Sequence, residues 1–177
     1  FTRVKGDSSF PTHAINYCLN EAGIQIEEVD DIVFYENNLN KFQRILVTHH
    51  LNSPHSIKSY LMAISKWITK DLWLDKEIAK ELMLKKKKII MYDHHMSHAA
   101  SAFFPSPFEK AAILTIDGVG EWATTTYGVG EKNKIKLMKQ MNFPDSIGLL
   151  YSAFTYYLGF KINFDEYKVM GLAPYGK

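Results

Sequence analysis

The sequence has few of the features that mark disulfide-stabilised or membrane-spanning proteins. Its 177 residues include one cysteine, Cys18, which excludes an internal disulfide framework and favours a reducing, cytoplasmic compartment. Because Cys18 falls within an apolar helical pattern, we predict that it lies in the core and does not act as a nucleophile. No apolar run reaches the roughly 18 to 20 residues that cross a bilayer, so we expect no membrane partner.

An excess of charge of one sign is also missing. The chain has 21 basic and 19 acidic residues, which give a formal net charge of +2. This balance argues against a nucleic-acid backbone as the main partner. The one strongly basic run, residues 85–88, follows a helical pattern, and we interpret it as a solvated helix end.

The pattern of apolar residues predicts an α/β protein with a mixed sheet, because strand-like runs both alternate with helices and follow one another. The last three strands form a predicted antiparallel meander. Aromatic residues between 151 and 160 are assigned to the core, and the glycine-bearing tail, residues 163–177, is predicted to be loop or turn. The predicted helices are residues 9–23, 57–84 with a break near 71–75, 94–104 and 146–158; the predicted strands are residues 31–35, 88–92, 111–117, 122–129 and 134–141.

Three histidines within five residues form the pattern that most strongly suggests chemistry. Residues four apart lie on one face of a helix, so His94 and His98 can point at the same ion. Two imidazoles suit iron, zinc or another transition metal, and they require a further ligand, typically a carboxylate. Because His95 is three residues from His98, the spacing does not decide which of the paired histidines binds. The alternative is that these are polar residues at the start of a buried helix, bonded to backbone.

The motif DGVGE at residues 117–121 ends an apolar strand and opens a hairpin. Glycines let backbone amides approach a phosphate closely, and an acid at a strand end can hold a metal-bound water. An ordinary hairpin turn explains the motif when it is considered alone. The threonine-rich return strand favours a phosphate-cradling hairpin, and its candidate nucleotide-side residues are Asp117, Gly118, Gly120 and Glu121.

The last seven residues, GLAPYGK, formally match the spacing of a P-loop. A P-loop needs an apolar strand before it and a helix after it, and Pro174 interrupts the loop here. We therefore do not expect a P-loop. The segment can still contact nucleotide, with Gly171 in the loop and Lys168 or Lys177 reaching a phosphate. His49 and His50 share no helix face with His94 that the sequence can show, although they could line the same cleft.

Four segments that together cover most of the chain carry a family resemblance: FTRVKGDSSFPTHAINYCLNEAGI, DHHMSHAASAFFPSPF, LTIDGVGEWATTTYGVG, and DSIGLLYSAFTYYLGFK through DEYKVMGLAPYGK. On these segments the chain resembles the nodulation-type and antibiotic-tailoring O-carbamoyltransferases. The resemblance implies a partial actin/hexokinase-like ATPase fold, a mixed sheet with flanking helices, truncated at both ends. Residues 1–177 would then form part of the N-terminal carbamoyl-transfer domain, and the smaller adenylate-forming domain would be absent.

The resemblance also implies a reaction. Carbamoyl phosphate and ATP are joined into carbamoyl-adenylate, and the carbamoyl group then passes to a hydroxyl of a small-molecule acceptor. His94 and His98 would bind a divalent metal, iron first and zinc second, residues 117–121 and 168–176 would line the nucleotide cleft, and Mg²⁺ would belong to the missing domain. A base for the acceptor could be His95, the metal or a phosphate oxygen. We expect the carboxylate ligand to lie after Lys177, so that this chain alone is inactive and binds metal weakly.

Two other functions stay open on the sequence. A kinase or ATPase of the same fold would phosphorylate its acceptor without requiring carbamoyl phosphate. A regulator that binds metal or nucleotide without catalysis would lack the adenylate-forming domain. Nucleic acid is not an expected partner, and assembly into a homodimer is left open.

Overall fold

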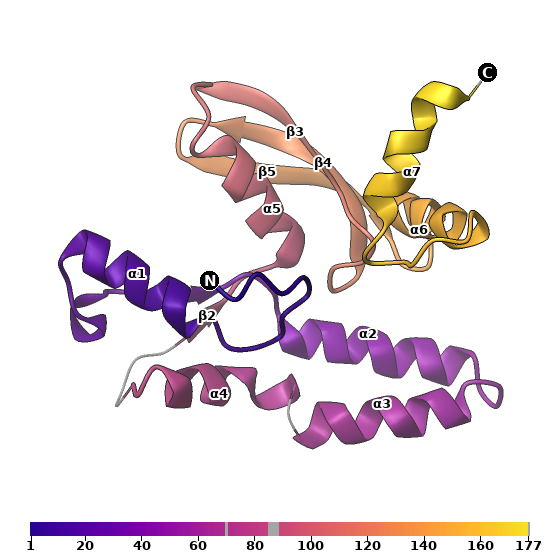
Figure 1. Ribbon diagram of the computed structural model, residues 1–177, viewed down its shortest axis with the longest axis horizontal. Helices are drawn as coiled ribbons and strands as arrows, with labels where there is room; N and C mark the ends of the chain where they lie inside the picture. Colours follow the sequence, from indigo (N-terminus) through magenta and orange to yellow (C-terminus); the bar gives the residue numbers. More distant parts are fainter. Residues whose placement is uncertain (70, 85–88, 177) are drawn as a thin grey trace.

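The computed structural model describes residues 1–69, 71–84 and 89–176 (Figure 1). The basic run at 85–88 and Lys177 lie outside the described residues, so the predictions made for them are not addressed. The chain forms two sheets with helices around them, which confirms the α/β class. The predicted mixed sheet needs correction, because the described strands form a parallel pair and a separate antiparallel sheet. No helix within the described part of the chain combines the length and the apolar character needed to cross a membrane.

The first sheet is a parallel pair in which β1 (Ile32–Phe34) lies beside β2 (Ile89–Met91). Parallel strands need a long crossover connection, and helices supply it here. The crossover consists of α2 (Asn38–Leu51), α3 (Ile57–Thr69), a 3₁₀ turn at Asp71–Trp73 and α4 (Leu74–Glu81). The break predicted near residues 71–75 is therefore confirmed. Phe42 of α2 stacks on the buried Trp67 of α3, with ring centroids 5.6 Å apart.

The second sheet is the predicted antiparallel meander, in the order β3 (Lys110–Ile116), β4 (Ala123–Glu131) and β5 (Lys134–Asn142). Helix α5 (His94–Phe103) lies against one face of this sheet (Figure 1). Ala99, Phe103 and Ile113 form the buried cluster that joins the helix to the sheet. Gly130 of β4 is required at this contact, since a Cβ there would lie 2.7 Å from atoms of the Phe103 ring.

The other helical segments of the described chain precede β1 or follow β5. Helix α1 (Thr12–Ala22) ends as predicted at Gly23, which adopts a left-handed conformation with φ of +66°. A 3₁₀ turn at Ile26–Glu28 leads into β1, and helix α6 (Ile147–Tyr157) begins at the predicted cap, because the Ser146 hydroxyl accepts the N–H of Leu149. Helix α7 (Glu166–Leu172) and a 3₁₀ turn at Ala173–Tyr175 complete the chain.

Two secondary-structure predictions need correction. The tail predicted as loop or turn forms α7 and its following 3₁₀ turn. Side chains organise its start, because Asp165 accepts the N–H of Lys161 and Glu166 accepts the N–H of Asn163. Helix α2 was not predicted at all. The signal for it was Asn37, whose side chain accepts the N–H groups of Leu39 and Asn40 as a helix cap.

Two predictions of burial are wrong. Cys18 is exposed, because α1 has no buried residue and its apolar side lines an open cavity of about 800 Å³ beside β1 and α4. The aromatic residues of α6 do not form a core either, since Tyr156 and Tyr157 are 75% and 82% exposed. Only Thr155 is buried among the residues of α6, so no described segment covers its apolar side.

Candidate metal centre

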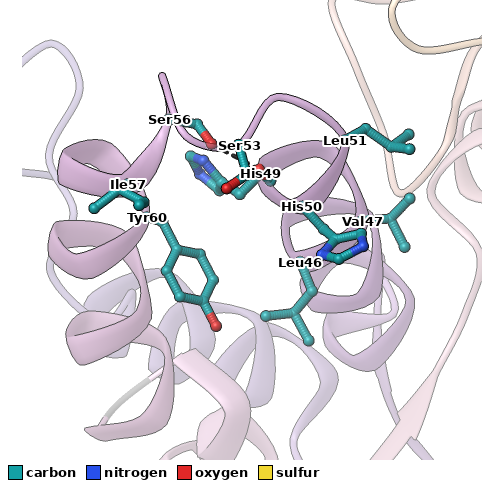
Figure 2. A pocket seen from close by; sticks show the side chains of 9 residues that line it. All are labelled: Leu46, Val47, His49, His50, Leu51, Ser53, Ser56, Ile57 and Tyr60. Carbon is teal, nitrogen blue, oxygen red and sulfur yellow. Dashed lines mark hydrogen bonds between the residues drawn. The ribbon is translucent and has the colours of Figure 1, made fainter.

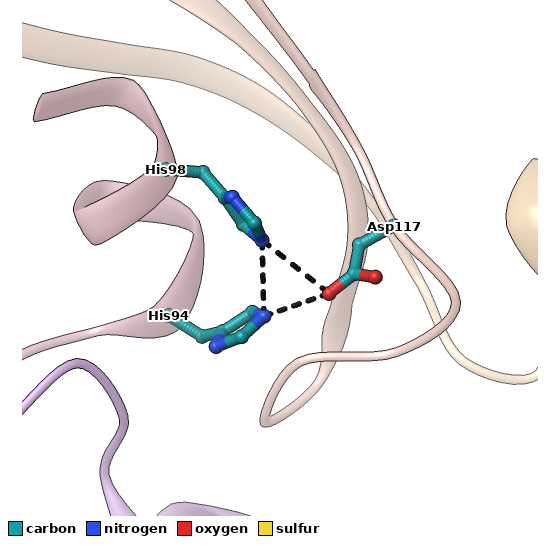
Figure 3. Close-up of side chains that lie close together, drawn as sticks. All are labelled: His94, His98 and Asp117. Carbon is teal, nitrogen blue, oxygen red and sulfur yellow. Dashed lines mark hydrogen bonds and ion pairs between the residues drawn. The ribbon is translucent and has the colours of Figure 1, made fainter. Parts of the chain in front are cut away.

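Helix α5 brings two of the predicted ligands onto one side. Asp93 is the N-cap of this helix, and its side chain accepts the N–H of Met96 at 3.3 Å. His94 and His98 follow one turn apart, so both rings face the point where β3 ends (Figure 3). Asp117 is the first residue after that strand. Its carboxylate meets the two imidazoles.

The ligand atoms of His94, His98 and Asp117 form a small triangle. Nε2 of His94 lies 2.7 Å from Oδ2 of Asp117 and 3.1 Å from Nε2 of His98, and the third side, from His98 to Asp117, is 3.6 Å. A metal at about 2.0 to 2.2 Å from nitrogen and oxygen ligands needs ligand atoms about 3 Å apart. The three residues therefore fit a divalent transition metal in a two-histidine, one-carboxylate arrangement.

Accessibility of the three side chains differs in a way that matters for chemistry. The side chain of His94 is 15% exposed, whereas those of Asp117 and His98 are 32% and 49% exposed. One ligand is thus embedded and the other two border solvent. A metal held by three protein ligands with open positions can accept a substrate atom, which a closed four-ligand structural site cannot.

The electrostatics of His94 and Asp117 are coupled. The hydrogen bond with Asp117 raises the pKa of His94 above its ordinary value, and burial opposes this rise. The same hydrogen bond holds the pKa of the Asp117 carboxyl far below its usual range. Asp117 is therefore available as an anionic ligand, and a metal ion that binds here takes the place of a proton shared with His94.

His95 lies apart from this triangle. Its ring is fully buried, with Nε2 at 2.8 Å from the carbonyl of Ala123 and Nδ1 at 2.6 Å from the hydroxyl of Thr115. A carbonyl only accepts, so Nε2–H donates to Ala123 and Nδ1 accepts from Thr115. Thr115 in turn accepts from Thr126, 2.6 Å away. Burial lowers the pKa of His95, and the base role predicted for this residue is disfavoured by its neutral, enclosed position.

The hairpin loop between β3 and β4 packs directly on the histidines. A Cβ on Gly120 would lie 3.1 Å from Cδ2 of His95 and 3.2 Å from the side chain of His94. The N–H of Gly118 donates to Oδ1 of Asp117 at 2.7 Å. Gly120 therefore lets the loop approach the histidines closely, and the backbone of Gly118 holds the Asp117 carboxylate. The phosphate-cradling function predicted for them stays a prediction.

Glu121, also predicted to face nucleotide, is only 4% exposed. Its Oε1 accepts the N–H of Asn37 at 2.6 Å, and both of its oxygens accept the N–H of His94 at 3.1 Å. The carboxylate thus contacts backbone at the starts of two helices, α2 and α5. The burial of Glu121 could not be predicted from the sequence, because an acid in a glycine-containing turn is normally exposed.

Sequence reasoning also missed Gly148, in the first turn of α6. A Cβ at this position would overlap the carbonyl of Asp117, so the helix packs directly against the backbone of the candidate ligand. The hydroxyl of Ser146 donates to the carbonyl of Gly118 at 2.7 Å. Helix α6 therefore supports the loop that carries Asp117.

Lys168 and Gly171, the remaining predicted nucleotide-side residues, lie on α7. The ammonium of Lys168 pairs with Asp165 at 2.9 Å, which raises the pKa of Lys168 and lowers that of Asp165. Gly171 faces open space, since a Cβ there would meet no atom within 4 Å. The ammonium of Lys168 also lies over the rings of Phe160 and Tyr167. Contact of Lys168 or Gly171 with nucleotide stays a prediction.

His49 and His50 line a separate cavity of about 510 Å³ between the end of α2 and the start of α3 (Figure 2). The ring of His49 meets the ring of Tyr60 edge-on, 5.6 Å between centroids, and its carbonyl accepts from Ser56. Glu121 contacts the other end of α2, about 18 Å away along the helix at 1.5 Å per residue. The possibility that His49 and His50 line the same cleft as His94 is therefore excluded.

Comparison with known proteins gives a consistent result. The chain matches the family described as Carbamoyltransferase N-terminus over residues 1–177. A protein of Synechocystis sp. described as uncharacterized is 53% identical over 184 residues, which cover 100% of this chain and 30% of that protein. Nodulation protein NolNO of Sinorhizobium fredii is 38% identical over 178 residues, 98% of this chain and 24% of NolNO. Nodulation protein NolO of Bradyrhizobium diazoefficiens is 44% identical over 84 residues, 48% of this chain.

The chain thus spans 30% of the length of one of these relatives and 24% of another. The candidate site lies within the matched region, because the family match includes every residue from the histidine helix to the loop that carries Asp117. The resemblance seen in the sequence is confirmed by the family match. The chain belongs to the carbamoyltransferase N-terminus family.

Proposed function

We propose that the chain is part of an O-carbamoyltransferase in which His94, His98 and Asp117 hold a divalent metal. The observation that carries this proposal is the triangle of ligand atoms, with sides between 2.7 and 3.6 Å, in a chain of the carbamoyltransferase N-terminus family. The carboxylate ligand that we expected beyond Lys177 has a candidate within the chain, Asp117. Iron is the first choice of metal and zinc the second.

The chemistry suits a site of this kind. A carbamoyl carbon is a poor electrophile, and an adenylate supplies a good leaving group. The acceptor oxygen forms a bond to the carbamoyl carbon, the bond from that carbon to the phosphate oxygen breaks, and AMP leaves. A bound metal supplies a Lewis acid that can polarise a carbonyl or hold the nucleotide.

The protein's own residues have narrower tasks. His94 and Asp117 are hydrogen-bonded to each other, and they lie on separate elements that approach closely because Gly120 has no side chain. The partial exposure of His98 and Asp117 leaves an approach for substrate. Because both nitrogens of His95 are engaged, we propose that the proton of the acceptor hydroxyl goes to a phosphate oxygen of the leaving AMP.

Metal content by elemental analysis tests the site. We expect stoichiometric iron or zinc in the wild-type protein and its loss in His94→Ala, His98→Ala and Asp117→Ala. His50→Ala is the matched control, since it removes an exposed histidine at the far end of α2 and should leave metal content unchanged. Metal that survives all three ligand substitutions would overturn the proposed centre.

The transfer reaction needs a separate assay in the whole protein. We expect carbamoylation of a hydroxyl acceptor to depend on both ATP and carbamoyl phosphate, and to fall with loss of the metal ligands. ATP consumption with phosphorylation of the acceptor, independent of carbamoyl phosphate, would instead identify a kinase of the same fold. Metal binding without turnover of either kind would favour a regulator.

A further inference from the structure

A second carboxylate lies next to the candidate metal centre without belonging to the ligand triangle. Glu121 is the only acidic residue among the buried polar residues of the described chain. Glu121 lies four residues after Asp117 in the loop between β3 and β4. This loop therefore presents one acid to the imidazole rings and a second acid to the backbone of α5. The two acids therefore have different partners on the same helix.

The partners of Glu121 are backbone amides at two helix starts. Asn37 is the N-cap of α2, and His94 is the first residue of α5. The first N–H groups of a helix have no partner within it, and the helix dipole makes this end electropositive. One carboxylate here satisfies such donors from two helices, at 2.6 Å for Asn37 and 3.1 Å for His94.

These bonds join three elements that are distant in sequence. Glu121 is separated by 84 residues from Asn37 and by 27 residues from His94. The ring of Tyr35, just before α2, also packs on the ring of His94 at 5.6 Å. The histidine that is most deeply embedded in the triangle is thus held through its backbone by the hairpin and through its ring by the end of β1.

A side chain in this position is poorly suited to bind a nucleotide directly. Both of its oxygens already accept hydrogen bonds from backbone, and only 4% of the residue is exposed. The buried guanidinium of Arg44 on α2 interacts favourably with Glu121, an effect that opposes the lowering of the Arg44 pKa by burial. Glu121 is therefore surrounded by groups of the protein that stabilise a negative charge.

We propose that Glu121 is a positioning residue of the metal centre, which fixes the backbone of His94 relative to the hairpin that carries Asp117. This inference rests on the proposed metal site. It assigns Glu121 a role distinct from the nucleotide contact that its motif suggested. Residues that orient metal ligands without touching the metal typically change affinity by about 10- to 100-fold when removed.

The test uses Co²⁺ alone as the probe, because its absorption bands report ligand geometry and their growth gives an affinity. We expect Glu121→Ala to weaken Co²⁺ binding by about 10- to 100-fold. Glu121→Gln should weaken Co²⁺ binding less than Glu121→Ala, because the amide oxygen can still accept a backbone N–H. It should still weaken binding relative to the wild type, because the NH₂ group would face a backbone N–H donor. At saturating Co²⁺ both variants should show shifted bands, since His94 no longer has a fixed position.

A matched control separates positioning from general loss of stability. Ile113→Ala creates a cavity in the cluster that joins α5 to the sheet, and it removes no hydrogen-bond partner of Glu121. We expect this control to lower the melting temperature at least as much as Glu121→Gln, yet to keep the wild-type Co²⁺ spectrum at saturation.

The outcomes distinguish the two proposals. If the wild-type protein binds no Co²⁺, the metal centre itself fails. If the wild type binds Co²⁺ and Glu121→Gln keeps both its affinity and its spectrum, the metal centre stands and the positioning role is overturned. Equal weakening by Ile113→Ala and Glu121→Gln, with unchanged spectra, would also overturn the positioning role, because stability alone would explain it.

Discussion

Helices α5 and α6 have similar lengths and opposite environments. Helix α5 buries His95, Ala99 and Phe103 against the three-stranded sheet, whereas α6 buries only Thr155 although its sequence is richer in large apolar residues. The two helices nevertheless meet at one place, the loop that carries Asp117. Helix α5 supplies the histidines there, and α6 supports the loop through Ser146 and Gly148.

The difference shows what apolar periodicity can establish. A stripe of apolar residues predicts a helix, but burial requires a second surface that fits it. Helix α5 has such a surface, because Gly130 leaves space for the Phe103 ring and Ile113 lies beside it. The candidate metal ligands therefore lie on the helix whose position is fixed by packing, as a pre-organised site requires.

The largest expected effect comes from removing the main anchor of α5. Phe103→Ala should lower the free energy of unfolding by about 3 to 5 kcal/mol, because Phe103 is 4% exposed and its loss leaves a cavity between helix and sheet. Urea denaturation followed by circular dichroism gives this value.

The matched control is Phe154→Ala on α6, where the ring is 56% exposed. This variant should change the free energy of unfolding by no more than about 0.5 kcal/mol. Similar losses in the two variants would mean that α6 is as firmly packed as α5, and the contrast between the helices would not hold.

A smaller effect is expected at the surface that receives Phe103. Gly130→Ala should destabilise the protein by about 1 to 3 kcal/mol, because the added methyl would lie 2.7 Å from the aromatic ring and force it to move. The double variant Gly130→Ala with Phe103→Leu should recover part of this loss. Additive losses in the double variant would show that the two residues do not share the contact.

The buried histidine of α5 gives a prediction that sharpens the division of roles within the helix. Thr115→Val removes the hydroxyl that donates to Nδ1 of His95 and accepts from Thr126, so it should cost about 1 to 3 kcal/mol of unfolding free energy. Metal content should stay at the wild-type level. Loss of metal in this variant would place His95 among the residues on which the centre depends.

Much of the fold could be predicted from sequence because its signals are local. The capped start of α6, the glycine that ends α1 and the alternating pattern of the meander all act within a few residues, and the structure confirms them. The prediction for the tail was wrong because it rested on polar residues and glycine as loop signals, while Asp165 and Glu166 organise the turn that leads into a helix there. The predicted burial of the α6 aromatic residues was wrong because burial depends on whether another segment packs against the helix.

The same distinction between local and long-range signals applies to the candidate site. Helical spacing placed His98 within reach of both His94 and His95 without deciding between them, and the structure brings His98 to His94, with 3.1 Å between their Nε2 atoms. The contact of these histidines with Asp117 depends on how α5 packs against the sheet. His94 and Asp117 are 23 residues apart, so spacing along one helix does not predict their contact. Glu121 is a stronger case, because its partner Asn37 is 84 residues away and belongs to a helix that the sequence did not reveal.

The smallest effect is expected on α7, and its sign is opposite. Gly171 lies in the helix and faces open space, so Gly171→Ala meets no atom within 4 Å. Alanine loses less backbone entropy on folding than glycine, so the variant should be more stable by about 0.4 to 1 kcal/mol. Thermal denaturation beside Gly130→Ala provides the comparison, since the same added methyl is crowded in one position and free in the other. Destabilisation by Gly171→Ala would mean that this side of α7 contacts another surface.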